Sequence, residues 1–252
     1  MPSVSVITPL YNGASFIEDC IESVARQSFD DLEHIVIDND SSDDGPDRVR
    51  ALLESHPRLK LVHSKTPGAG PTRNVGIEEA QGRFIAFLDA DDTWKPSKLK
   101  TQIERMRFYD QVFSWSGYDI WRDDACLRYQ PVPIEASFRD IVTKRVVIGC
   151  LTAVYDCERL GKRFMNDMPL RQDFCLFADI ARDAEGQGLP FGGINQSLAN
   201  YRLHESNGSA NKARAASMQW RAYRDHFGYS RLRSGLLFGG YAARALKSRL
   251  QD

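Results

Sequence analysis

The 252-residue sequence is long enough for one α/β domain with a large hydrophobic core. Hydrophobic residues make up 42% and charged residues 27% of the chain, a composition that excludes a disordered protein. A net charge of −1 excludes a protein that binds nucleic acid through its overall charge, so no nucleic-acid partner is expected.

The charge is unevenly distributed along the chain. Residues 212–252 contain nine Lys and Arg against two Asp and Glu, a net charge of +7, which leaves −8 for the first 211 residues. A basic helical extension of this kind is typical of a solvated helical face. It is also typical of contact with an anionic membrane or with an acceptor that carries phosphate. A packed helix or a contact in a homodimer would produce the same pattern.

Several features of the sequence bear on the cellular compartment in which the protein is expected. The number of cysteines is five, and no C-x-x-C pair occurs, which disfavours a structural zinc site and a disulfide framework. The first ten residues have a strand pattern and do not resemble a signal peptide. No apolar run has the length of a membrane span. A cytoplasmic protein is therefore expected, either soluble or peripheral on the inner face of the membrane.

The first half of the chain alternates short apolar runs with amphipathic stretches. This pattern predicts strands over 4–8, 34–37, 59–63 and 84–88, with Pro9 ending the first one. It predicts helices over 14–27, 47–55 and 72–80 and a fourth from Pro96. Such alternation with short connections predicts an α/β fold with a Rossmann-like, mostly parallel central sheet flanked by helices.

The second half is less regular. Its apolar runs predict strands over 112–118, 146–155 and 198–203 and a helix over 174–182. From Ala213 onward the pattern is helical and basic, with Gly239-Gly240 as a weak point in the helix.

Several polar residues follow the predicted parallel strands. In sheets of this class, ligands bind beyond the carboxyl ends of the strands. The residues expected at those ends are Pro9 and Tyr11, then Asp38, then the Gly/Pro loop 66–71, and then Asp89, Asp91 and Asp92. They are expected to converge on one crevice.

The acidic stretch 89–92 carries the strongest chemical signal. Three carboxylates at one strand end repel one another, and a divalent cation that also binds diphosphate oxygens would remove that repulsion. Mg²⁺ and Mn²⁺ suit such an oxygen-rich site. The alternative is an acidic turn in which Asp92 and Thr93 cap the helix predicted from Pro96.

Asp38 and Arg73 have two interpretations each. Asp38 is either an acceptor for a base N–H or a sugar hydroxyl, or a residue of a turn-forming stretch. Arg73 follows a glycine-containing loop at a helix start, where an anion such as diphosphate is favoured, or it is a surface arginine. The chain lacks both the P-loop pattern and a G-x-G-x-x-G dinucleotide motif.

Four segments in this order resemble glycosyltransferase family 2, whose members have the GT-A fold. The matching segments are 4–12, 35–43, 68–77 and 82–94. In the second segment Asn39 and Asp40 replace the family's usual second aspartate and glycine, whereas Asp38 is kept. The last segment contains the family's D-x-D-D-x-W pattern.

Two segments of the second half also resemble the family. Residues 164–174 resemble the stretch that ends in a glutamate–aspartate pair, where Gln172 replaces the glutamate and Asp173 is kept. Residues 201–209 resemble the Y-R-x-H segment, which contains His204. His204 is either a metal or diphosphate contact or a structural histidine.

The resemblance implies an inverting, metal-dependent glycosyltransferase of bacterial polysaccharide biosynthesis. Its donor would be a nucleotide sugar, most simply a UDP-sugar, and its acceptor a glycan or a lipid-linked sugar. The implied cofactor is Mn²⁺ or Mg²⁺. The implied catalytic base is Asp173, the donor-binding residues are Thr8, Pro9, Tyr11, Asp38, Arg73, Asp89 and Asp91, and the metal ligands are Asp91, Asp92 and His204.

The implied organisation places donor binding in residues 1–110, acceptor binding and the base in 111–211, and the basic helical extension in 212–252. Two other functions remain open. One is a nucleotide-sugar-binding protein with impaired catalysis, in view of Asn39, Asp40 and Gln172. The other is a sugar nucleotidyltransferase, but such enzymes usually carry a lysine in the loop after the first strand, and residues 9–13 contain none.

Overall fold

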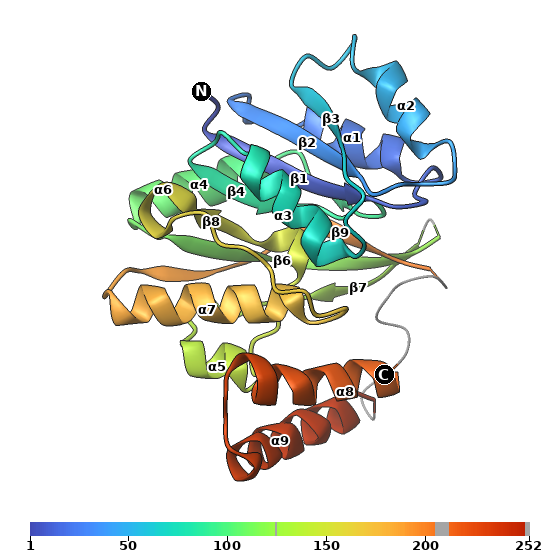
Figure 1. The fold of residues 1–252 in the computed structure, drawn as a ribbon. Helices are drawn as coiled ribbons and strands as arrows, with labels where there is room; N and C mark the ends of the chain where they lie inside the picture. Colours follow the sequence, from blue (N-terminus) through green and yellow to red (C-terminus); the bar gives the residue numbers. More distant parts are fainter. Residues whose placement is uncertain (124, 205–211, 250–252) are drawn as a thin grey trace.

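The computed structural model describes residues 1–123, 125–204 and 212–249, and its centre is a nine-stranded sheet with helices on both faces (Figure 1). The strands of the first half are β1 (Val4–Leu10), β2 (Leu32–Asp38), β3 (Leu59–His63), β4 (Phe84–Phe87) and β5 (Thr93–Trp94). The helices of this half are α1 (Ile17–Ala25), α2 (Gly45–Leu52), α3 (Ala69–Glu79) and α4 (Lys98–Phe108).

The second half adds four strands and a group of helices below the sheet in Figure 1. The strands are β6 (Phe113–Arg122), β7 (Ala125–Gln130), β8 (Val154–Asp156) and β9 (Phe191–Leu203). The α-helices are α5 (Phe138–Val142), α6 (Cys157–Leu160), α7 (Gln172–Gly186), α8 (Lys212–Arg221) and α9 (Arg231–Arg249). A 3₁₀ turn covers Cys150–Thr152, and a π-helical turn covers Ala222–His226.

The strand order is β3-β2-β1-β4-β8-β6-β9-β5, with β7 paired to β6. The first-half strands β3, β2, β1 and β4 pair in parallel, as expected. The second half is mixed, because β6 and β9 are parallel while β8, β7 and β5 pair antiparallel with their neighbours. The α/β class and the helical C-terminal extension are thus confirmed.

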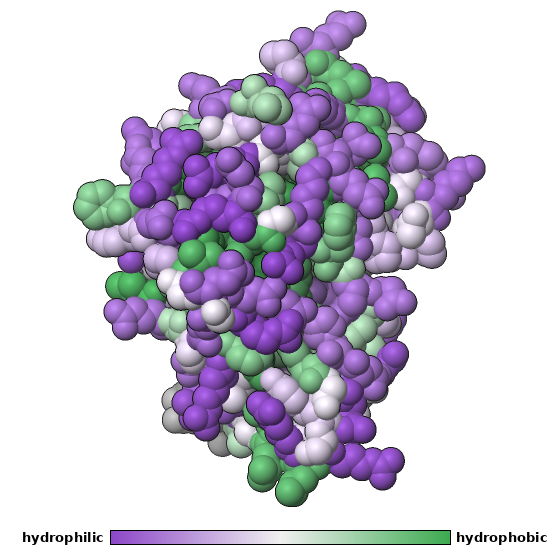
Figure 2. All heavy atoms as spheres, turned by 60° about the vertical axis from the view of Figure 1, so that its left-hand side comes forward, coloured by the Kyte–Doolittle hydropathy of each residue, from purple (hydrophilic) through white to green (hydrophobic). Residues whose placement is uncertain are grey.

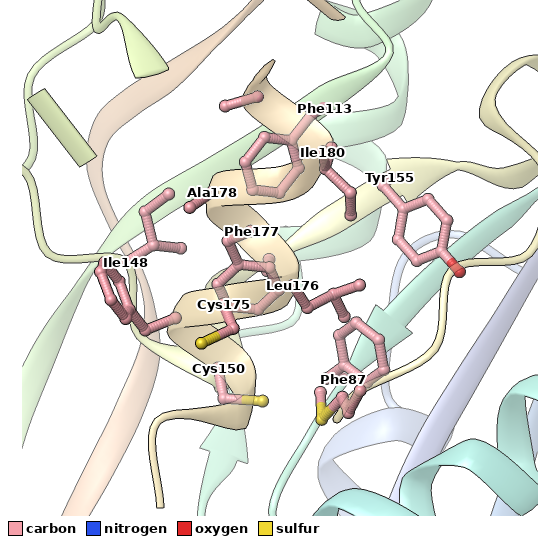
Figure 3. Packing of buried hydrophobic residues seen from close by; sticks show 14 of the residues in the cluster. Phe87, Phe113, Ile148, Cys150, Tyr155, Cys175, Leu176, Phe177, Ala178 and Ile180 are labelled. Atoms are coloured by element: carbon pink, nitrogen blue, oxygen red, sulfur yellow. The ribbon is translucent and has the colours of Figure 1, made fainter. Parts of the chain in front are cut away.

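Apolar residues on both faces of the sheet explain why helices cover both sides. Every residue of β2 and β4 is buried, as in strands covered on two faces. On one face α7 packs its Phe177 ring at 6.2 Å from Phe87 and 5.6 Å from Phe113, centroid to centroid (Figure 3). On the other face, Ile21 of α1 and Ile103 of α4 belong to a separate cluster of buried hydrophobic residues.

Two predicted strand boundaries were wrong. β1 does not end at Pro9 but continues to Leu10. Pro9 lies beyond Ile7, the last residue of β1 that is in register with β4, so its missing N–H costs no ladder bond on that side. The predicted strand 146–155 is reduced to β8. The Trp94 indole donates to the Leu151 carbonyl at 2.7 Å, so this carbonyl bonds a side chain and not a neighbouring strand.

Two helix predictions also changed. α3 begins at Ala69, three residues before the expected start, with Pro71 in its first turn, where a missing N–H is tolerated. α9 continues through Gly239-Gly240, so these two glycines do not interrupt the helix. Packing supports this helix, since the rings of Phe238 and Trp220 lie 5.9 Å apart.

The helical extension forms the lower end of the molecule in Figure 1, and the same end carries hydrophobic side chains at its surface in Figure 2. Leu232 and Leu236 of α9 are 77% and 72% exposed. In the part of the chain that the structure describes, none of the helices combines the length and the apolarity needed to cross a membrane.

Candidate active site

The carboxyl ends of β1, β2 and β4 meet at one edge of the sheet, and the predicted donor-site residues follow these ends. Asp38 ends β2, and residues 89–92 follow β4 in a turn closed by the Asp92 N–H, which donates to the Asp89 carbonyl at 3.0 Å. This turn does not cap α4, because α4 begins at Lys98 after Ser97, and Thr93 and Trp94 form β5. The helix-cap interpretation of the acidic stretch was therefore wrong.

Arg73 joins α3 to this acidic turn. Its guanidinium is buried and donates to the Asp89 carboxylate in an ion pair. Burial alone would lower the pKa of Arg73, but the charges of Asp89 and nearby Cys150 raise it above its ordinary value, and Asp173 adds to the effect. Arg73 is not a surface arginine, because its charge is held inside the site beside two carboxylates.

Asp91 pairs with His204 across the same edge. The His204 Nε2 lies 2.7 Å from an Asp91 carboxylate oxygen, and its ring stacks on Phe16 with 5.0 Å between centroids. Burial and the negative charge of Asp89 raise the pKa of Asp91, whereas the bond to His204 lowers it. The ionised form of Asp91 therefore benefits from any further positive charge at this edge.

Asp92 differs from its two acidic neighbours because it is buried. It is 1% exposed and accepts a hydrogen bond from the Arg202 N–H at 2.9 Å, which ties β9 to the acidic turn. Burial, followed by the charges of Asp91 and Asp89, raises its pKa well above the ordinary value. Of the three acids, Asp89 and Asp91 have side chains open to solvent, at 30% and 26% exposure.

The side chains at this edge fit a divalent ion whose remaining coordination positions would be filled by phosphate oxygens of a bound ligand. Among the described residues, no group of three or more His, Cys, Asp and Glu side chains forms a metal site by itself. Asp91 and His204 nevertheless place a carboxylate and an imidazole at one point. Mg²⁺ and Mn²⁺ are commonly held by one or two protein carboxylates and by phosphate oxygens, so Asp91 fits such an ion, and His204 beside it would be a further ligand.

Asp38 faces the same edge from β2. It accepts hydrogen bonds from the Ser41 N–H at 3.1 Å and from His63 Nδ1 at 3.2 Å. His63 ends β3 and was missed in the sequence, although the strand-end argument that selected Asp38 applies to it equally. Pro9 is half-buried and Tyr11 is 65% exposed, so the Tyr11 side chain is available to a ligand.

Thr8 is not open to a ligand at this edge, contrary to expectation. It is fully buried, and its hydroxyl lies 2.9 Å from the His34 Nε2. Burial, with a further contribution from the charge of His56, lowers the pKa of His34 to about 3, so this histidine is neutral. Because side chains alternate along a strand, Thr8 points into the core and supports the site from below.

Asp173 comes to this edge from the second half. It lies in the first turn of α7, half-buried, and its carboxylate accepts from the Phe174 N–H at 2.8 Å. Its charge acts on Arg73 from the first half and on Lys144, which follows α5. Lys144 was missed in the sequence because nothing in its own segment distinguishes it.

Comparisons with known proteins identify the family of this chain. The family description "Glycosyl transferase family 2" matches residues 5–155. The chain belongs to glycosyl transferase family 2. It is 35% identical, over 99% of its length and 98% of the relative's, to TuaG of Bacillus subtilis (strain 168), which is named as a teichuronic acid biosynthesis glycosyltransferase.

Other relatives of this family 2 enzyme extend the comparison. The chain is 34% identical, over 86% of its length and 83% of the relative's, to Escherichia coli WfgD, named UDP-Glc:alpha-D-GlcNAc-diphosphoundecaprenol beta-1,3-glucosyltransferase. Its fold matches S. aureus TarS 1-349 in complex with UDP-GlcNAc, with a TM-score of 0.69, 18% identity and coverage of 94% of this chain and 70% of that chain. It also matches the mannosyltransferase PcManGT of Pyrobaculum calidifontis in complex with GDP-Man and Mn²⁺, with a TM-score of 0.66, 19% identity and coverage of 100% and 76%. The GT-A fold is thereby confirmed.

Proposed function

We propose that this family 2 enzyme is an inverting glycosyltransferase that moves a hexosyl or N-acetylhexosaminyl group from a nucleotide sugar to an acceptor hydroxyl. The observation that carries the proposal is the position of Arg73. It is paired to Asp89 of the donor edge and lies within the field of Asp173 from the second half. Such an arrangement would suit a cation that stabilises the leaving group and a general base acting at one reaction centre.

The donor side follows from the residues at the sheet edge. Asp38 and the exposed Tyr11 would contact the nucleoside, and Arg73 the diphosphate. Asp91 and His204 would hold a Mn²⁺ or Mg²⁺ ion, which neutralises charge on the departing diphosphate. A UDP-sugar is supported by the relative named for UDP-Glc and by the neighbour in complex with UDP-GlcNAc.

The acceptor side depends on Asp173. Its carboxylate would take the proton from an acceptor hydroxyl while that oxygen attacks the anomeric carbon. The attack comes from the face opposite the nucleotide. One carbon–oxygen bond forms as the bond to the diphosphate breaks, and the configuration inverts. Arg73, already desolvated, stabilises the negative charge that develops on the leaving group without reorganising. A glycan or a lipid-linked sugar is the proposed acceptor.

One observation bears on the alternative of a binding protein with impaired catalysis. Gln172, which replaces the family's glutamate, is 7% exposed, and its carbonyl oxygen has no hydrogen-bond partner among the described residues. Asp173 beside it keeps its carboxylate half-exposed. The neighbouring carboxylate, and not Gln172, is the group that catalysis requires in the proposed mechanism.

Calorimetry of nucleotide binding tests the donor proposal. We expect UDP to bind about tenfold or more tightly in Mn²⁺ than in chelator, and D91N to lose this gain because the carboxylate ligand is gone. D110N is the matched control, since Asp110 is exposed at the far end of α4 and pairs with Arg159. Equal affinity in Mn²⁺ and in chelator would contradict the metal site. Tighter binding of GDP than of UDP would assign guanine, and not uracil, as the nucleobase of the donor.

A product assay separates the reaction classes. Incubation with a panel of nucleotide sugars and Mn²⁺ is expected to release a nucleoside diphosphate from the true donor. Release of pyrophosphate would instead indicate a sugar nucleotidyltransferase. Binding without release of either product would indicate the catalytically impaired protein.

A further inference from the structure

A group of cations lies near the N-terminal end of α7, the end that carries Asp173. Its members are Lys144, Arg171 and Arg244, called the cation cluster below. Arg171 immediately precedes α7, Lys144 follows α5, and Arg244 belongs to α9. The three residues come from separate segments of the second half, so only the tertiary structure brings them together.

The contacts show how closely the three cations are gathered. Arg171 donates from Nη2 to the Tyr241 hydroxyl at 3.2 Å, and Tyr241 lies one helical turn before Arg244 on α9. Arg244 donates to the carbonyl of Thr143, the residue that precedes Lys144. The positive charge of Arg171 in turn acts on Lys144. These interactions hold the three cations near one another.

The charge of Asp173 acts on Lys144, but the three cations outnumber this carboxylate. In the described part of the chain none of the three cations is in an ion pair, and the Nε atoms of Arg171 and Arg244 are buried without hydrogen-bond partners. Lys144 rests its ammonium group 3.8 Å from the centre of the Phe174 ring. Burial, and then the charge of Arg171, lowers the pKa of Lys144 to about 7, whereas the negative charge of Asp173 acts in the opposite direction.

The arrangement of backbone around Arg171 is also unusual. Its φ angle is 73°, in the left-handed region that non-glycine residues rarely adopt. Two residues later comes Asp173. A side chain in this conformation is held by its contacts, here those with Tyr241, and such residues cluster at functional sites.

An amphipathic cleft of about 380 Å³ adjoins the cluster between α5 and α9. Val142 and Leu237 line it with apolar surface, and Arg139 and Arg233 line it with charge. Thr143 belongs both to this cleft and to the contact with Arg244. A molecule with an apolar chain and an anionic head would match the cleft and the cluster in that order.

We propose that the cation cluster binds a phosphate or diphosphate group of the acceptor, with the acceptor's lipid chain in the cleft between α5 and α9. This inference rests on the proposed function, because Asp173 would then deprotonate the sugar carried by that phosphate. The cluster neutralises the anion on the acceptor side, as Arg73 does on the donor side. The surplus of unpaired cations carries the proposal, since charge-assisted bonds to phosphate would satisfy them.

The test measures binding to the full chain after its donor site has been saturated with UDP and Mn²⁺, so that an added phosphate cannot enter that site. The probes are farnesyl diphosphate, inorganic pyrophosphate and farnesol. We expect farnesyl diphosphate to bind, and K144Q and R244Q each to weaken it about tenfold, because each removes one charge-assisted contact. K100Q is the matched control, since Lys100 is exposed on α4.

The outcomes separate this inference from the proposed function. Failure of UDP to bind the parent protein would count against the donor site and not against the cluster. If both K144Q and R244Q bind farnesyl diphosphate as the parent does, or lose no more than K100Q, the inference is overturned. Pyrophosphate binding as tight as that of farnesyl diphosphate would overturn the lipid-linked source. Farnesol is expected to bind far more weakly than farnesyl diphosphate, and equal binding would overturn the role of the cations.

Discussion

The two halves of the chain supply their site residues in different ways. In the first half Asp38, Asp89 and Asp91 each follow a parallel strand, so the topology of the sheet alone brings them to one edge. In the second half Asp173 and Lys144 follow irregular segments, and helix packing positions them. The proposed donor-site positions are therefore readable from strand ends, whereas the proposed acceptor-side positions depend on long-range packing.

Replacing Asp173 tests the catalytic half of this comparison and has the largest expected effect. D173N removes the proposed base, and we expect turnover to fall by ~10²–10⁴-fold, the usual contribution of general base catalysis. UDP affinity in Mn²⁺ is expected to remain, because Asp173 is not among the residues proposed to bind UDP or the metal ion. The measurements are the rate of nucleoside diphosphate release in the presence of acceptor and UDP calorimetry.

Asp167 provides the control for that experiment, since it is an exposed aspartate in the same segment. D167N is expected to retain turnover. Near-normal turnover in D173N would falsify the assignment of the base. A loss of UDP binding in D173N would show that the two halves are not separable in function.

Two helical glycines test the packing difference between the halves. A Cβ at Gly76 of α3 would lie 2.6 Å from Ile7 and 2.7 Å from Ile37, both core residues of the parallel sheet. We expect G76A to lower the free energy of unfolding by about 1–3 kcal/mol through overpacking. Among the described residues, a Cβ at Gly239 of α9 would meet no atom within 4 Å beyond its chain neighbours and its own helix backbone, and G239A is expected to add about 0.5–1 kcal/mol through helix propensity.

Urea denaturation with an unchanged m-value measures both substitutions. A lower free energy of unfolding in G76A together with a higher one in G239A would support tight packing of α3 on the sheet and loose packing around α9. Equal stability of G76A and the parent would mean that α3 can move away from the sheet. Destabilisation by G239A would mean that α9 is packed on the side that carries this glycine.

The exposed face of α9 yields the smallest expected effect. We propose that Leu232 and Leu236, with Arg231 and Arg233 beside them, contact an anionic membrane. In flotation with vesicles containing anionic lipid, replacement of both leucines by serine is expected to reduce the bound fraction severalfold, because apolar burial and charge act together. Leu127 of β7 is 50% exposed, and L127S is the control. Equal flotation of all variants would end the membrane proposal and leave packing or a homodimer contact.

Sequence reasoning was most accurate where local pattern and topology agree. The apolar runs located β2, β3 and β4 to within two residues, since their periodicity and bounding turns are local properties. The placement of Asp38 and Asp89 then followed from the rule for strand ends. Asp173, by contrast, was identified only through resemblance to family 2, because no local pattern marks it.

The sequence by itself determined the alternation of strands and helices, the acidic turn after β4 and the basic character of α8 and α9. Only the tertiary structure decided that Thr8 and Asp92 face the interior, bonded to His34 and to the Arg202 N–H. The tertiary structure also decided that most of the predicted strand 146–155 is not a strand, since the Trp94 indole donates a hydrogen bond to the Leu151 carbonyl. These outcomes share one physical cause. Burial and hydrogen bonding between residues far apart in the chain select a side chain's direction, and no local periodicity encodes that choice.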